Sequence, residues 1–230
     1  TPFVTALAVL SLGSSLIVGC VLPSKSMEQL PRLGGDKIIR YAKAIEIDPK
    51  DADAYFDRGL AKHELEDYQG AIGDYDKAIQ INPNVADYHY NRGLAKRELG
   101  DYQGEIYDYN QVIEINPNLA IVYNNRGAAK YKLEDCQGAI VDYSKAVEID
   151  SQYANANSNR GASKRKLEDY QGAIADYSKA IEINPQYANA YNNRGVTKYK
   201  LEDYQGAIAD YNMAIEINPQ YADYYFNRGY

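Results

Sequence analysis

The chain of 230 residues carries 32 Asp and Glu against 25 Lys and Arg, which gives a formal net charge of -7. This acidic balance argues against a phosphate-binding surface, so we predict no nucleic-acid partner. The two cysteines, Cys20 and Cys136, cannot form a disulfide framework. The sequence has no glycine-rich phosphate loop, serine nucleophile motif or Cys-x-x-Cys pair, and neither histidine has a second metal ligand at helical spacing. We therefore predict a protein that is not an enzyme and that uses no metal, cofactor or small-molecule substrate.

The first 24 residues contain no charged side chain, and the first charge is Lys25. An apolar stretch of this length predicts a signal peptide or a membrane anchor over 1–24, followed by a polar linker over 25–36. Residues 17–20, Ile-Val-Gly-Cys, resemble a bacterial lipobox, in which Cys20 becomes the lipidated N-terminus. An uncleaved transmembrane anchor, an ordinary cleaved signal and a buried helix are the alternatives. Lipidation or an anchor predicts a cell-envelope location, membrane-anchored or periplasmic, with membrane contact through the N-terminus only.

The rest of the chain is built from a repeat of 34 residues. A fixed period of this length predicts a solenoid, in which each unit buries its apolar face against its neighbours. A degenerate half repeat over 37–51 comes first. Five complete units follow, which we number repeats 1 to 5: 52–85, 86–119, 120–153, 154–187 and 188–221. Residues 222–230 begin a sixth unit and stop partway through its first helix.

Each unit predicts two helices, as repeat 5 illustrates. The first covers roughly 190–201. Asp203 is a credible N-cap for the second, which covers 204–217 and has apolar residues at helical spacing. Asn218 and Pro219 end it, because proline disfavours helical geometry in the residue before it. The unit is therefore predicted to be an antiparallel helix pair.

The residues shared by these units resemble the tetratricopeptide repeat family of the bacterial type. The resemblance rests on the period and on Gly195, Ala207, Tyr211, Ala214 and Pro219 with their counterparts. It implies an all-α, right-handed superhelical solenoid of antiparallel helix pairs, whose first helices line a concave groove that binds a peptide or a partner protein. Glu105 departs from the pattern by replacing the small alanine, and we expect its carboxylate to reach solvent or a cation.

An arginine stands where the family usually has a leucine-like residue, and it recurs at the same period. An aspartate recurs in register with it on the second helix. We predict that each arginine pairs with an aspartate of its own or a neighbouring repeat, since guanidinium meets carboxylate in two bonds. The alternative is that the arginines line the groove and bind anionic ligands. The arginines are Arg58, Arg92, Arg126, Arg160 and Arg194, with a sixth at Arg228, and the aspartates are Asp74, Asp108, Asp142, Asp176 and Asp210.

The resemblance also implies which side chains face the groove. The groove is expected to change from aromatic, apolar and mixed-charge at one end to basic and amide-rich at the other. The lysines among the groove residues have the alternative of being ordinary solubilising charges. The predicted partner-binding residues are Phe56, Leu60, His63, Tyr90, Leu94, Arg97, Asn124, Tyr131, Lys132, Arg165, Lys166, Asn192, Tyr199 and Lys200.

These features together predict a protein–protein interaction scaffold that is tethered to a membrane or exported across one. The expected partner is a protein or a peptide held in the concave groove. A different class of function is a non-catalytic module that selects substrates for a larger enzyme, whose C-terminal part would follow Tyr230. RNA binding by helical repeats is a third possibility, which the net charge disfavours.

Overall fold

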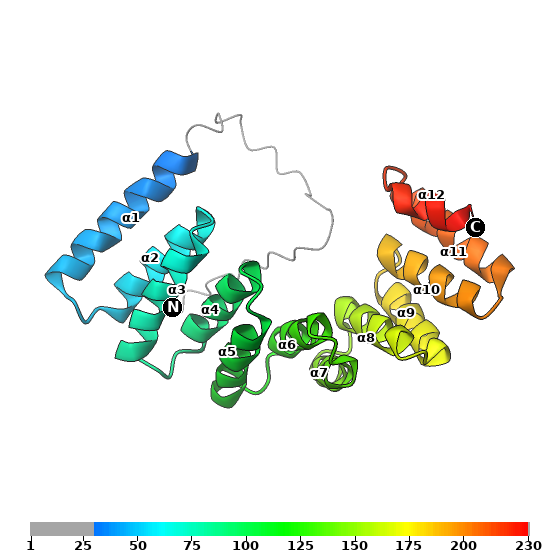
Figure 1. The fold of residues 1–230 in the computed structure, drawn as a ribbon, viewed down its shortest axis with the longest axis horizontal. Helices are drawn as coiled ribbons and strands as arrows, with labels where there is room; N and C mark the ends of the chain where they lie inside the picture. Colours follow the sequence, from blue (N-terminus) through cyan, green and yellow to red (C-terminus); the bar gives the residue numbers. More distant parts are fainter. Residues whose placement is uncertain (1–29, 230) are drawn as a thin grey trace.

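A computed structural model describes residues 30–229, and side chains from Gly35 onward. Every regular element in this range is an α-helix, and the helices follow one another in an open arc (Figure 1). None of these helices combines the length and the apolar character that crossing a membrane requires. The helices are α1 (Leu30–Ile47), α2 (Ala52–Glu64), α3 (Tyr68–Ile81), α4 (Ala86–Glu98), α5 (Tyr102–Ile115), α6 (Ala120–Lys132), α7 (Cys136–Ile149), α8 (Ala154–Lys166), α9 (Tyr170–Ile183), α10 (Ala188–Lys200), α11 (Tyr204–Ile217) and α12 (Ala222–Arg228).

The prediction of an all-α superhelical solenoid of helix pairs is confirmed. We call the even-numbered helices, which open each repeat, A helices, and the odd-numbered ones B helices. Each A helix packs on the B helix that follows it, and each B helix also packs on the next A helix. The second helix of repeat 5 has the predicted bounds, whereas the first begins and ends slightly earlier, at Ala188 and Lys200. Helix α1 begins at Leu30, so residues 30–36, expected to be linker, are helical; residues 1–24 and Cys20 lie outside the described range.

Each complete B helix begins at an aspartate that caps it, as the sequence predicts for Asp203. The Asp203 carboxylate accepts a hydrogen bond of 2.9 Å from the backbone N–H of Gly206. The residue before this cap lies in the left-handed region of backbone conformation, with φ of 62° at Glu202. Repeat 2 has Gly100 at this place, where glycine adopts the same conformation without steric cost. In the other four repeats a glutamate adopts this conformation, which is strained for a residue with a side chain. The tight turn between the A and B helices is therefore specified by residues of the turn itself, at some conformational cost in these four repeats.

In each repeat a glycine of the A helix lies directly against the ring of a tyrosine of the B helix. A Cβ atom added to Gly195 would lie 2.7 Å from the ring of Tyr211, a distance that real Cβ atoms do not occupy. The tyrosine is buried in all five repeats. Cys136 is also buried. The repeated glycine is thus required by close helix packing.

The predicted pairing of arginine with aspartate is confirmed in all five complete repeats. In repeat 3, the Arg126 guanidinium donates to both oxygens of Asp142, with Nε 2.9 Å from Oδ2. Two contacts were not predicted from the sequence. Lys130, one turn after the arginine, lies 2.8 Å from the same carboxylate, and Arg126 Nη1 donates to Asn110 of the preceding repeat at 2.7 Å. The arginine therefore joins its own helix pair and also holds the neighbouring repeat in register.

The buried Glu105 carboxylate is paired with Arg97, one of the residues predicted to line the groove. Arg97 Nε lies 2.6 Å from Oε1 of Glu105, and Arg97 Nη2 donates to the Tyr109 hydroxyl at 2.9 Å. The expectation that the Glu105 carboxylate reaches solvent or a cation is confirmed, and the group it meets is the cation Arg97. Its other oxygen, Oε2, is buried and has no hydrogen-bond partner among the described residues. Burial raises the pKa of Glu105 above its ordinary value, and the nearby Arg97 charge opposes that rise.

Candidate functional site: the concave groove

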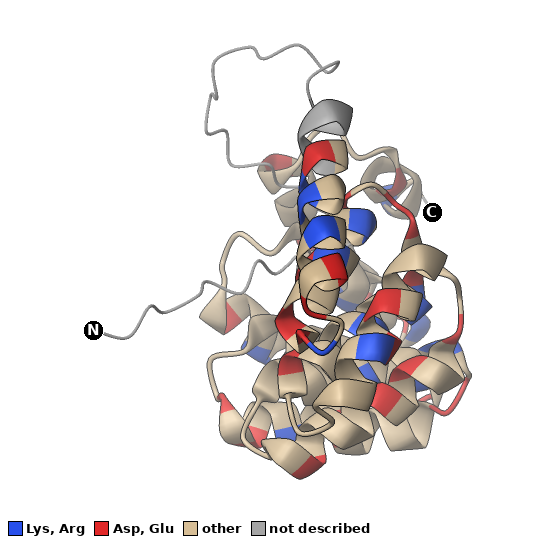
Figure 2. Cartoon of the chain, turned by 90° about the vertical axis from the view of Figure 1, so that its left-hand side faces the viewer, with Lys and Arg blue, Asp and Glu red and all other residues tan. Residues whose placement is uncertain are grey.

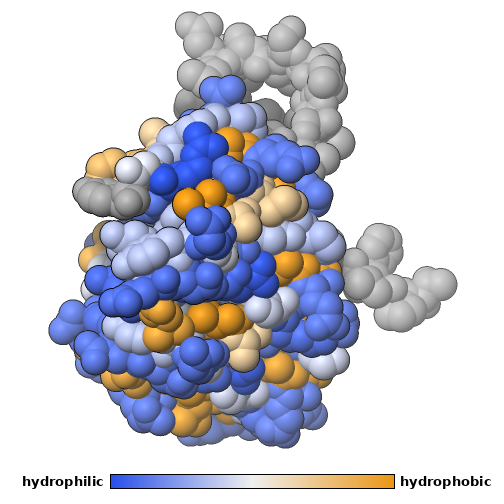
Figure 3. Space-filling view, turned by 90° about the vertical axis from the view of Figure 1, so that its right-hand side faces the viewer, coloured by the Kyte–Doolittle hydropathy of each residue, from blue (hydrophilic) through white to orange (hydrophobic). Residues whose placement is uncertain are grey.

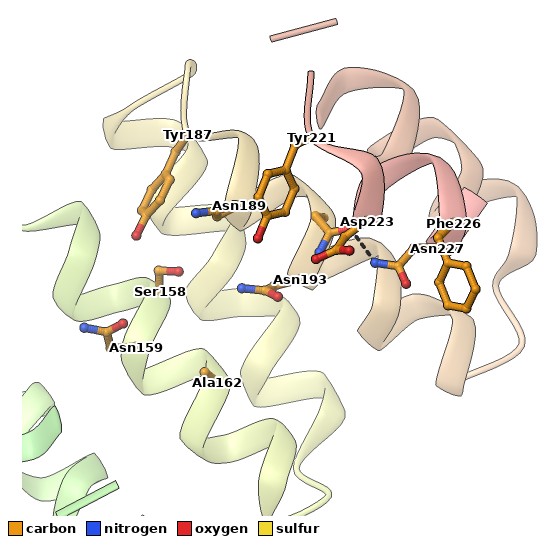
Figure 4. A pocket seen from close by; sticks show the side chains of 11 residues that line it. Ser158, Asn159, Ala162, Tyr187, Asn189, Asn193, Tyr221, Asp223, Phe226 and Asn227 are labelled. Carbon is orange, nitrogen blue, oxygen red and sulfur yellow. Dashed lines mark hydrogen bonds between the residues drawn. The ribbon is translucent and has the colours of Figure 1, made fainter. Parts of the chain in front are cut away.

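The A helices line the inner side of the arc, and the B helices form its outer side (Figure 1). The inner side of the A helices is called the concave groove below. A pocket of about 630 Å³ lies in it where α8, α10 and α12 come together (Figure 4). Its lining is made of amide and aromatic side chains with few others: Ser158, Asn159, Ala162, Tyr187, Asn189, Asn192, Asn193, Tyr221, Asp223, Phe226 and Asn227.

Hydrogen bonds between neighbouring repeats hold several of these amides in place. Asn227 donates from Nδ2 to Oδ1 of Asn192 at 2.9 Å (Figure 4). Asn159 donates in the same way to Asn124 of the preceding repeat at 3.0 Å. Each bond fixes one end of the donor amide, so the Oδ1 atoms of Asn159 and Asn227 keep their accepting capacity for a ligand. Amide oxygens of this kind can accept hydrogen bonds from the N–H groups of an extended peptide backbone.

Two tyrosines from the segments that precede α10 and α12 stand over the amides. In Figure 4, Tyr187 and Tyr221 lie on either side of Asn189 and point their hydroxyl groups toward the pocket. The Tyr221 ring packs against Tyr224 with centroids 4.8 Å apart. Burial raises the pKa of Tyr187, and a hydrogen bond with Ser158 opposes the rise. Both residues offer an aromatic face with a polar hydroxyl tip, a combination that is typical of binding sites.

Charge is distributed unevenly along the array. Repeats 1 and 2 together contain thirteen acidic residues against six Lys and Arg, whereas repeats 3 to 5 contain thirteen against twelve. The excess of seven in repeats 1 and 2 accounts for the net charge of the chain. Helix α1, which precedes them, carries Lys and Arg along its length (Figure 2). Repeats 1 and 2 are therefore acidic as a whole, whereas repeats 3 to 5 are nearly balanced in charge.

The apolar residues predicted for the first half of the groove are half-buried and pack into the core. The Phe56 ring lies 4.9 Å from that of Tyr88 and 5.7 Å from that of Tyr75. Leu60 packs on the same cluster, and Tyr90 stacks on Tyr109. Leu94 is half-buried as well. These side chains support the groove wall more than they offer contact area.

The predicted polar residues of the first three repeats are mostly engaged. His63 packs on the edge of the Tyr68 ring, with centroids 5.1 Å apart, and burial lowers its pKa. Arg97 is held by Glu105, and Asn124 is buried and accepts from Asn159. The structure therefore leaves little of these three side chains for a ligand.

The basic residues predicted further along the groove are more accessible. Lys132, Lys166 and Lys200 are exposed, and Lys166 lies over the Tyr131 ring at 5.3 Å while it pairs with Glu134. The half-buried Arg165 has a buried Nε atom without a hydrogen-bond partner among the described residues. These residues do not line the pocket.

The last predicted residues divide between the pocket and the end of the array. Asn192 alone of the fourteen lines the pocket. Tyr199 lies at the α11–α12 end, where it packs on Tyr204 and borders a small hollow with Ile208. This end exposes apolar side chains among polar ones, as the orange patches in Figure 3 show.

Sequence reasoning missed most of the pocket, although the signals were present. An asparagine precedes the repeated arginine in repeats 2 to 5 and in the sixth unit, and it includes Asn159, Asn193 and Asn227. A tyrosine also recurs at the end of the last three complete repeats, and it includes Tyr187 and Tyr221. Both patterns have the period of 34. The prediction missed these residues because it favoured the A-helix positions that vary between repeats.

Comparison with known proteins agrees with this architecture. A family pattern described as TPR repeat matches residues 59–100, 93–134 and 163–202, and two further tetratricopeptide repeat patterns match 41–73 and 188–221. No curated protein sequence matches the chain. Among solved structures, YrrB, described as a TPR protein with an unusual peptide-binding site, superposes with a TM-score of 0.69 at 22% identity, covering 83% of this chain and 98% of its own.

Two further structures have the same fold. MamA from Desulfovibrio magneticus RS-1 superposes with a TM-score of 0.69 at 19% identity, covering 73% of this chain and 95% of its own. PilF from Pseudomonas aeruginosa superposes with a TM-score of 0.67 at 20% identity, covering 78% and 83%. At these identities the likeness establishes the fold alone.

Proposed function

Because the chain belongs to the tetratricopeptide repeat family, we propose that it is a non-catalytic scaffold that binds a segment of a partner protein along the concave groove. The observation that supports this most directly is the pocket formed by three successive A helices. Three of its amides, Asn159, Asn193 and Asn227, occupy the same position of three successive A helices, so the array presents the same polar group repeatedly along the groove. The peptide-binding site described for YrrB, which has the same fold, is consistent with this use of the groove.

The groove proposal is tested by capture of partners with the full chain and two matched variants. Replacing Asn159 and Asn193 with alanine removes pocket amides without touching the arginine–aspartate pairs. Replacing Lys145 and Lys179 with alanine changes two charges on the outer B helices instead. Partners recovered by the wild type and the lysine variant, but not by the asparagine variant, would support the proposal. Equal recovery by all three proteins would refute it.

We also propose that residues 1–24 direct the protein to the cell envelope and that Cys20 is lipidated. The support is the uncharged run that ends at Ile17-Val18-Gly19-Cys20. Metabolic labelling with a palmitate analogue in a bacterial host should modify the wild type and not a Cys20→Ser variant. Labelling of both, or of neither, would count against lipidation at Cys20. Neither result bears on the groove.

The alternative role as a substrate-selecting module of a larger enzyme keeps the same groove and differs in what lies beyond Tyr230. A catalytic domain encoded downstream would favour it. Further repeats followed by a stop codon would favour the scaffold.

A further inference from the structure

The pocket has one charged group, and that group has no counter-ion. Asp223, in the first turn of α12, is the only charged residue among the lining side chains. Within the described residues its exposed carboxylate forms no ion pair and no side-chain hydrogen bond. A carboxylate beside a partly enclosed hollow, with no lysine or arginine in the lining, produces a local negative potential that attracts a cation.

The surroundings of Asp223 suit a cation that is flat and rich in hydrogen-bond donors. Tyr187 and Tyr221 present aromatic rings, whose faces attract cations. The Oδ1 atoms of Asn159 and Asn227 can accept further hydrogen bonds because both amides donate elsewhere through Nδ2. Carboxylate, aromatic face and amide oxygens are the three kinds of contact that a guanidinium group makes.

This combination occurs once in the described array. Aspartate also stands at the register of Asp223 in repeats 1 and 2, as Asp53 and Asp87. Neither has a tyrosine two residues earlier, as Asp223 has in Tyr221, and Asp53 accepts a hydrogen bond of 2.5 Å from Tyr88. Repeats 4 and 5 have the tyrosine with asparagine in place of aspartate. Asp87 is therefore a matched control for the charge of Asp223 without its pocket.

We propose that this pocket binds an arginine side chain of the partner peptide, an inference that rests on the proposed peptide-binding function. The guanidinium pairs with Asp223, lies against Tyr187 and Tyr221, and donates its remaining N–H groups to the amide oxygens. Lysine fits less well, because its compact ammonium offers three donors and no planar face. A volume of about 630 Å³ is within the range of pockets that hold drug-sized ligands, and it leaves room for the backbone on both sides of the arginine.

The test is a selection of random peptides on the immobilised full chain, followed by affinity measurements. Wild type, Asp223→Asn, Asp223→Lys and the control Asp87→Asn are panned in parallel against one displayed library. Peptides selected by the wild type and by Asp87→Asn should be enriched in arginine, and those selected by Asp223→Asn should not. For a selected arginine peptide carrying a fluorophore, fluorescence anisotropy should show about tenfold weaker binding to Asp223→Asn, since a hydrogen-bonded charge contributes about that much. The Asp223→Lys chain should prefer acidic peptides.

The outcomes separate this inference from the function on which it rests. If the wild type selects peptides but their arginine content does not depend on residue 223, the assignment of the pocket is wrong and the scaffold stands. If the Asp87 variant loses the enrichment to the same extent, the preference reflects the net charge of the chain and the assignment is again wrong. If the wild type selects no peptides, the groove does not bind peptides and both proposals fail.

Discussion

Replacing Arg97 with leucine should strongly destabilise the second repeat, because it removes the cation that compensates a buried carboxylate. Glu105 is fully buried, and its Oε1 atom lies 2.6 Å from Arg97 Nε. Its Oε2 atom has no hydrogen-bond partner among the described residues, so the carboxylate depends on the contacts of Oε1, of which the one with Arg97 carries the compensating charge. Breaking a buried pair by removing one partner costs about 3–5 kcal/mol. We expect Arg97→Leu to lower the free energy of unfolding around α4 and α5 by an amount in this range.

The size of this effect should depend on pH in a defined direction. Burial already raises the pKa of Glu105, and Arg97 limits that rise. Without Arg97 the folded-state pKa rises further, while the unfolded-state pKa stays ordinary. Between the two values the folded protein binds more protons than the unfolded chain, so its stability falls as the pH increases. The cost of Arg97→Leu relative to the wild type is therefore greatest at neutral pH and shrinks as the pH approaches the ordinary carboxyl range.

A matched control distinguishes the charge effect from the loss of a long side chain. Arg165 has the same register two repeats later, where Ala173 replaces the glutamate, and Arg165→Leu should cost less than about 1 kcal/mol. Urea denaturation followed by circular dichroism measures the total stability. Amide hydrogen exchange measures α4 and α5 separately, because repeat arrays do not always unfold in one step. Adding Glu105→Ala to Arg97→Leu should recover at least about 2 kcal/mol. If Arg97→Leu and Arg165→Leu lower the free energy of unfolding equally, or if the double variant recovers no stability, then Arg97 does not compensate the buried Glu105 carboxylate.

Three further changes test the packing of the repeat by thermal or urea denaturation. Gly195→Ala should destabilise the protein by more than about 1 kcal/mol because its new Cβ would overlap the ring of Tyr211. As a control, Gly73→Ala has nothing within 4 Å of the new atom and should stabilise α3 by up to about 1 kcal/mol. Equal changes in stability for the two variants would contradict the close contact at Gly195. Glu202→Gly should stabilise the protein by up to about 1 kcal/mol, because glycine adopts the positive φ of this turn without strain. As a control, Glu216→Gly lies within α11 and should destabilise the protein by about the same amount. A loss of stability in both variants would argue against strain at Glu202. Asp142→Ala should cost more than about 3 kcal/mol because it leaves an arginine and a lysine unpaired, and a loss below about 1 kcal/mol would mean that the pair is dispensable.

Of the fourteen residues predicted to bind a partner along the groove, only Asn192 lines this pocket. The sequence identifies which positions of an A helix are inward-facing, but it does not reveal how far successive A helices diverge. Phe56 and Leu60 face inward and yet are taken up by the core, because α2 and α4 approach closely enough for Phe56 to reach Tyr88. The hollow opens instead between α8, α10 and α12, where small and amide side chains such as Ser158 and Asn192 leave space.

What the sequence by itself determined is the structure of one helix pair. The Asp203 cap, the end of α11 at Ile217 and the bond between Arg194 and Asp210 all lie within a single repeat. The turn brings residues 16 positions apart into contact whatever the neighbouring repeats do, so spacing along the chain is enough to predict them. The same reasoning located Glu105 as an anomaly and required that its carboxylate reach solvent or a cation.

Only the tertiary structure decided the contacts between repeats, and the groove is made of them. The bonds from Asn227 to Asn192 and from Tyr224 to Asn189 each span 35 residues. Whether such atoms meet depends on the rotation between neighbouring repeats, which is the combined result of many weak contacts across the whole interface. No single residue encodes that rotation. The groove residues can be placed on the correct helix face from the sequence, but their grouping around Asp223 follows from the superhelix.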